Sequence, residues 1–158
     1  MADATTLTRG QESALGGAGR SHSGLMEAQH RLQRALGQAQ PGREREWAGL
    51  VLREMQAARQ LLAAHREEVQ GADGLYDQLR FEAPWLLPRL QQMVAQMARL
   101  EAEAADLETE ARRVSEGDLS GLVNIRHDAE RMLALLRDLL AKESDLMYER
   151  FNQPPALD

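Results

Sequence analysis

Apolar residues recur every three or four positions along most of the chain, which is the spacing of one face of an α-helix. These stripes predict helices over residues 25–39, 43–70, 84–113 and 119–151. Residues 72–79 are long enough to add a further turn or two of helix. The stripe of the second segment shows the spacing most fully, with Trp47, Leu50, Val51, Met55, Ala58, Leu61, Leu62 and His65.

Helix-breaking residues separate the four segments. Pro41 and Gly42 end the first, Gly71 ends the second, residues 114–118 interrupt the pattern after the third, and Pro154 with Pro155 prevents continuation of the fourth. Four amphipathic helices with short connections bury their stripes most economically against one another. The sequence therefore predicts an all-α fold, an antiparallel up-down four-helix bundle over residues 25–152.

Both ends of the chain lack this pattern. Residues 1–24 are rich in Gly, Ser, Thr and Ala, and we expect them to form a flexible, disordered N-terminal arm, with the first helix capped near Ser23. The arm is either an inert tail or a docking motif anchored by Leu7 and Leu15. Residues 153–158 are expected to form a C-terminal tail.

Composition strengthens the helical prediction. The chain has 25 Leu and 24 Ala against one Ile, five Val and four Thr. Strands are built from β-branched and aromatic residues, so a sheet is excluded. The absence of cysteine removes disulfides, thiolate catalysis and sulfur-ligated metals.

Charge and hydropathy exclude two classes of partner. A net charge of −6 argues against nucleic acid, which needs clustered cations. The apolar runs are too short to cross a membrane, and the N-terminus lacks a secretory signal. We therefore expect a cytoplasmic protein whose partner is another protein or a second copy of itself.

Of the four histidines, His65 alone falls on the core face of its helix, in line with Trp47 and Leu61. His30 and His127 point away from their stripes, and His22 belongs to the predicted arm.

Two spacings could carry metal chemistry. Glu27 and His30 have the i, i+3 spacing of di-iron carboxylate proteins, but both point away from the stripe and no second such pair exists. His65 and Glu68 form a further i, i+3 pair, with Glu68 at the edge of the core face.

Three stretches carry a resemblance to a known family. They are the segment from His65 through Ala72-Asp73-Gly74-Leu75-Tyr76, the stretch QMARLEAEAADL beginning at Gln96, and the ending KESDLMYERFN beginning at Lys142. Over residues 25–152 the chain resembles the bacterial hemerythrin-like, or HHE cation-binding, domain. That resemblance implies a four-helix bundle holding two irons between its helices, with roles in oxygen binding, oxygen sensing or iron handling.

Carried over residue by residue, the resemblance leaves most of the metal site missing. His65 and Glu143 match expected ligands and are the candidate metal residues. The other ligand positions are occupied by non-matching residues, namely Gln29, Gln70, Met97 and Leu139. Two ligands do not hold a pair of irons, and a residual site for a single metal ion would need water or a neighbouring carboxylate beside His65 and Glu143. A core histidine instead needs a hydrogen-bonding partner, for which Glu143 and Glu54 are the candidates.

The leading hypothesis is a non-catalytic hemerythrin-like bundle with a degenerate di-iron site and no cofactor, acting as a structural or protein-interaction module. The alternative is a metal-binding hemerythrin-like protein that uses iron for oxygen binding, oxygen sensing or iron handling. A third class, an enzyme with His65 as general base, needs a pocket that opens in the middle of the apolar stripe. We expect no catalytic residue.

Overall fold

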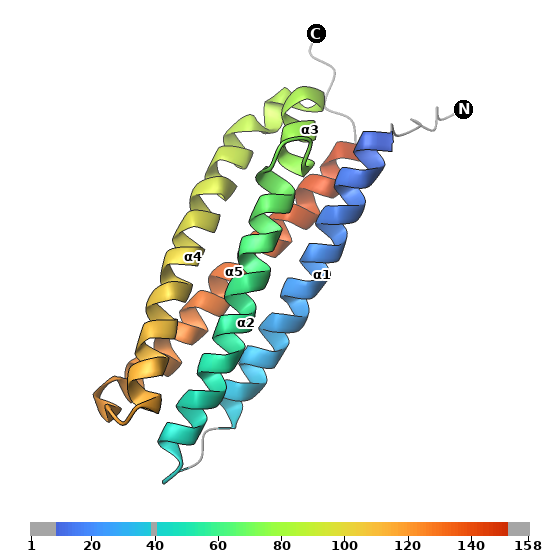
Figure 1. The fold of residues 1–158 in the computed structure, drawn as a ribbon. Helices are drawn as coiled ribbons and strands as arrows, with labels where there is room; N and C mark the ends of the chain where they lie inside the picture. Colours follow the sequence, from blue (N-terminus) through green and yellow to red (C-terminus); the bar gives the residue numbers. More distant parts are fainter. Residues whose placement is uncertain (1–8, 39–40, 152–158) are drawn as a thin grey trace.

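The computed structural model describes residues 9–38 and 41–151. Four long helices form a bundle in which neighbouring helices run antiparallel (Figure 1). A short helix and two 3₁₀ turns lie in the connections. In chain order the elements are α1 (Arg9–Gly37), α2 (Glu44–Gln70), α3 (Leu75–Glu82), η1 (Pro84–Leu86), α4 (Leu87–Ser115), η2 (Leu119–Gly121) and α5 (Leu122–Phe151).

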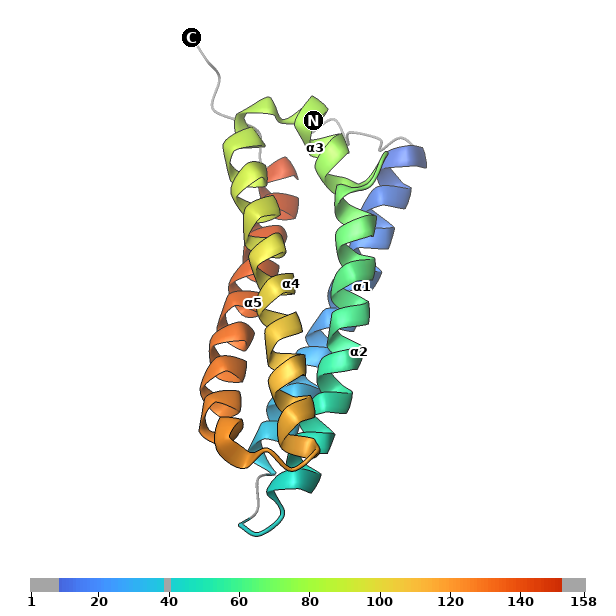
Figure 2. The same cartoon turned by 60° about the vertical axis from the view of Figure 1, so that its left-hand side comes forward.

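The long helices form a ring in which α1 lies beside α2, α2 beside α4, α4 beside α5, and α5 beside α1 (Figure 2). The short helix α3 lies across one end of the bundle, between α2 and α4. The prediction of an all-α, antiparallel up-down four-helix bundle is confirmed. No helix in the described part of the chain is long and apolar enough to cross a membrane.

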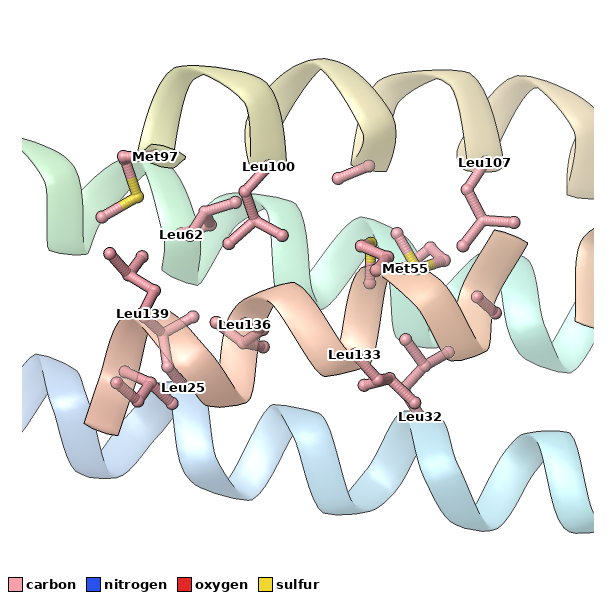
Figure 3. Packing of buried hydrophobic residues seen from close by; sticks show 14 of the residues in the cluster. Leu25, Leu32, Met55, Leu62, Met97, Leu100, Leu107, Leu133, Leu136 and Leu139 are labelled. Atoms are coloured by element: carbon pink, nitrogen blue, oxygen red, sulfur yellow. The ribbon is translucent and has the colours of Figure 1, made fainter. Parts of the chain in front are cut away.

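The core is a continuous apolar column between the four helices. Figure 3 shows Leu25 of α1, Leu62 of α2, Met97 of α4 and Leu139 of α5 pointing into this space. Each is at most 4% exposed. Full burial of a side chain of this size contributes about 1.5–3 kcal/mol, so the column provides most of the driving force for folding.

The first helix begins much earlier than the sequence pattern predicts. Residues 1–8 of the expected arm lie outside the described residues, but the prediction of a flexible arm is wrong for residues 12–24, which are helical. Ser23, the expected cap, lies inside α1. The predicted C-terminal tail of residues 153–158 also lies outside the described residues.

Small side chains explain why this extension is stable. Ala14, Gly17 and Ala18 are buried, so the first turns of α1 approach α2 closely. A Cβ at Gly17 would lie 1.6 Å from Oε1 of Glu68 on α2. Gly17 therefore acts as a close-packing position in a helix, although the number of glycines in this segment favours flexible chain.

The turn between α2 and α3 depends on two glycines. A Cβ at Gly71 would lie 2.4 Å from the carbonyl oxygen of Glu67, and one at Gly74 would lie 2.4 Å from that of Glu68. Between them Asp73 adopts φ 59°, a conformation that aspartate tolerates better than most residues. This tight turn sets the position of α3 over the end of the core.

We expect Gly74→Ala to lower the free energy of unfolding by about 1–3 kcal/mol, because the added methyl group meets backbone carbonyls that cannot rotate away. Gly19→Ala is the matched control: no atom lies within 4 Å of its Cβ position, and it is exposed on α1. In a helix that change should raise stability by about 0.5–1 kcal/mol. Urea unfolding followed by circular dichroism measures the free energy of unfolding of both variants. If Gly19→Ala leaves that free energy unchanged, the result would contradict a helical conformation at residue 19.

Candidate functional site

His65 lies in the core of the bundle near the C-terminal end of α2, and among the described residues it is the most buried polar side chain, with 0% of its surface exposed. Its Nε2 atom is 2.7 Å from Oε2 of Glu143 on α5. Its Nδ1 atom is 2.5 Å from Oγ of Ser21 on α1. Both ring nitrogens are therefore engaged, each by a different helix.

Glu143 is 1% exposed and is held from a second side by α3. The hydroxyl group of Tyr76 donates a hydrogen bond to its Oε1 atom over 2.8 Å. Both carboxylate oxygens are thus engaged by protein groups, as a buried carboxylate requires. We call Ser21, His65, Tyr76 and Glu143 the core quartet.

Tyr76 is fixed as a donor by its surroundings. Burial raises the pKa of the phenol well above its usual range, and the charge of Glu143 and the hydrogen bond to it raise that pKa further. The tyrosine therefore remains protonated and continues to donate to Glu143.

The hydroxyl group of Ser21 is shared between the histidine and the backbone of α1. Its hydroxyl group lies 3.1 Å from the carbonyl oxygen of Gly17 and 3.2 Å from that of Ala18, as well as beside His65. A hydroxyl group has one proton to donate. Ser21 can therefore donate either to a carbonyl oxygen of its own helix or to Nδ1 of His65.

The structure brings together the two candidate residues that the sequence identified. Of the two candidate partners of His65, Glu143 is confirmed, whereas Glu54 pairs with Arg31 over 3.4 Å on the surface. Glu68 is exposed over Gly17, away from the histidine ring. Glu27 and His30 are both exposed, as predicted.

Sequence reasoning missed two members of the quartet. Ser21 belongs to the predicted arm, yet it is half-buried and continues a regular series of buried positions on α1. The spacing of Ala14, Ala18, Ser21, Leu25, Ala28 and Leu32 alternates between four and three residues. Tyr76 belongs to a family-like stretch, but no spacing rule relates it to residue 143.

The residues present do not fit a pair of irons. The positions where the resemblance expects further ligands hold Met97 and Leu139, each 0% exposed, and the buried Gln29. The side-chain nitrogen of Gln70 is buried without a hydrogen-bond partner, and an amide nitrogen is a donor that does not ligate a cation. Within residues 9–38 and 41–151, no group of three or more His, Cys, Asp or Glu residues is arranged to hold a metal ion.

Ser21, His65 and Glu143 are hydrogen-bonded in the same order as the residues of a hydrolytic triad. A hydrolytic triad also needs a site that stabilises the oxyanion. A nucleophilic serine needs backbone amides free to stabilise an oxyanion. Ser21 lies in the interior of α1, where the neighbouring amides donate along the helix. The quartet therefore joins α1, α2, α3 and α5 through hydrogen bonds, and the backbone around Ser21 offers no free amide to an oxyanion.

Comparison with known proteins gives no assignment, because no family model, curated protein or solved structure matches this chain.

We expect Tyr76→Phe to lower the free energy of unfolding by about 1–3 kcal/mol near neutral pH, because Oε1 of Glu143 loses its donor. Above the unfolded tyrosine pKa of 10.0, the unfolded chain loses a proton that the folded chain keeps, so this contribution falls as pH rises. Between about pH 8 and about pH 11 the difference in free energy of unfolding between wild type and variant should narrow by about 1.4 kcal/mol. Urea unfolding at about pH 8 and about pH 11 measures the gap, and a gap independent of pH would refute the assignment.

Proposed function

We propose that this protein is a hemerythrin-like bundle with a degenerate di-iron site, and that it acts as a structural or protein-interaction module without catalytic activity. One observation carries the proposal. Both nitrogens of His65 and both oxygens of Glu143 are hydrogen-bonded to protein groups, and the two side chains are 0% and 1% exposed. Polar atoms that are already hydrogen-bonded to the protein in this way support a role in stabilising the fold more than a role in binding a ligand.

The apolar surroundings of the quartet support the same proposal. Met97 and Leu139 lie at positions where the resemblance expects histidines, and both pack into the column of Figure 3. Two histidines would be costly to bury at these positions without a metal ion to bind, because their ring nitrogens would lack partners. Methionine and leucine are stabilised by burial.

A role in protein interaction agrees with the surface at the α3 end of the bundle. Phe81 is 78% exposed and Trp85 is 49% exposed, on α3 and η1 respectively. Aromatic side chains of this kind are enriched at protein interfaces. The proposed partner is another protein or a second copy of the chain. The proposed location is the cytoplasm, because a chain without cysteine forms no disulfide and does not need an oxidising compartment.

The alternative is a metal-binding hemerythrin-like protein for oxygen or iron. The proximity of His65 and Glu143 favours it, because the two matching ligand positions do meet in the core.

Metal content separates the two proposals. Protein purified from iron-supplemented cells should contain well below one iron per chain, and a chelator should leave its melting temperature unchanged, because the quartet is complete without a metal. Elemental analysis and the visible absorption spectrum measure this. Iron near stoichiometric amounts, with charge-transfer absorption, would favour the alternative.

A combined substitution tests the structural role. Glu143→Leu alone should cost about 3–5 kcal/mol of stability, because it leaves His65 buried without its acid partner. The triple variant His65→Leu, Tyr76→Phe, Glu143→Leu should be more stable than that single variant, because no buried polar group then lacks a partner. Urea unfolding measures both.

The same protein can be tested for the enzyme class. A serine-reactive phosphonate probe should not label Ser21, because a mid-helix serine has no oxyanion site. Labelling that disappears in Ser21→Ala would contradict a non-catalytic quartet.

A further inference from the structure

Ion pairs between arginine and glutamate close three of the four seams between neighbouring long helices. Arg31 pairs with Glu54 between α1 and α2. The seam between α2 and α4 and the seam between α4 and α5 carry two pairs each. These pairs are Arg59–Glu108, Arg66–Glu101, Arg89–Glu149 and Arg131–Glu103.

The seam between α5 and α1 differs, because its cations reach neutral acceptors. Arg126 donates to the carbonyl oxygen of Leu36 over 3.3 Å, and Arg137 donates to Oε1 of Gln33 over 3.1 Å. In the part of the chain that the structure describes, neither arginine forms an ion pair with a carboxylate. The positive charge of each guanidinium is therefore not compensated by a paired carboxylate, and each side chain uses one nitrogen in these hydrogen bonds.

Both arginines line one groove of about 350 Å³. Its α1 wall is formed by Gln33, Leu36 and Gly37, and its α5 wall by Arg126, Glu130, Leu133 and Arg137. The α5 residues are spaced by four, three and four positions, so they form one face of the helix. Leu36 and Leu133 are 6% and 2% exposed and give the groove an apolar floor. We call this site the α1–α5 groove.

Arg126 is held in place before any partner arrives. Its guanidinium carbon lies 5.8 Å from the centre of the Trp47 ring, within the range of a cation–π interaction. Trp47 is fixed in turn, because its indole nitrogen donates to the carbonyl oxygen of Ala35 over 2.9 Å. A fixed guanidinium loses less conformational entropy on binding than a free one.

We propose that the α1–α5 groove binds an acidic segment of a partner protein, whose carboxylates pair with Arg126 and Arg137. The groove offers the arginine half of the pairs that close the other seams, and the partner supplies the carboxylate half. Glu130, between the two arginines, disfavours a polyanion and favours a segment of mixed acidic and apolar side chains. This inference rests on the interaction role proposed above and assigns it a surface and a partner chemistry.

The test uses the full chain and a short helical peptide of glutamate, leucine and alanine, with both ends blocked. Isothermal titration calorimetry measures affinity, and amide chemical shifts locate the peptide. Perturbations should gather around residues 33–37 and 126–137. A peptide with lysine in place of every glutamate should bind at least about tenfold more weakly.

Charge reversal in the protein gives the decisive comparison. Arg126→Glu with Arg137→Glu should abolish binding of the glutamate peptide and create binding of the lysine peptide. The matched control is Arg20→Glu with Arg53→Glu, which changes net charge equally at exposed arginines that form no ion pair in the described structure. This control should retain most of the glutamate-peptide affinity. If the charge-reversed protein fails to fold, Arg126→Gln with Arg137→Gln should show the loss of binding alone.

Three outcomes would overturn the proposal. They are equal loss of binding in both charge-reversed proteins, shift perturbations away from the groove, and binding of acetate or inorganic phosphate as tight as that of the peptide, which would indicate an unspecific anion site. None of these outcomes depends on metal content. Iron bound near His65 would refute the proposed function without affecting this test, and a failed peptide test would leave the structural role of the quartet in place.

Discussion

The hydrogen bond between His65 and Glu143 is the constraint on which the rest of the core depends. Without the other, each side chain would be a buried polar group that lacks a main partner. The hydrogen bond therefore fixes the position of α2 relative to α5 along the bundle axis. Apolar side chains tolerate small shifts of register, but a short contact between two buried polar atoms does not. The bundle therefore obtains a defined register from a polar pair and most of its stability from leucine and alanine.

Ser21 and Tyr76 extend that constraint to the other parts of the fold. The hydroxyl of Ser21 ties the first half of α1 to the pair, and Tyr76 does the same for α3 through the turn at Gly71 and Gly74. Three of the four seams outside the core follow another rule, since pairs of arginine and glutamate join the helices there. Each exposed pair contributes little to the free energy of unfolding, so these pairs affect which helices lie next to each other more than they stabilise the bundle.

The sequence was sufficient for the helices and for the bundle, because a period of three to four apolar residues leaves few other ways to bury a stripe. It was also sufficient to place His65 in the core and to propose Glu143 as its partner. It failed at Ser21, where alanine and glycine on the buried face of α1 provide too little hydrophobic contrast to mark a stripe. It failed at Tyr76 because the position of α3 depends on backbone geometry at Gly71, Asp73 and Gly74.

The order of the quartet along the chain has a consequence for synthesis of the protein. His65 and Glu143 are separated by 78 positions, and Glu143 lies in the last helix. A nascent chain that has released α1 and α2 from the ribosome can bury its leucines, but its core histidine has no carboxylate partner until α5 emerges. The native core is thereby completed only after α5 has been synthesised, and a chain that still lacks α5 buries a histidine without its carboxylate partner.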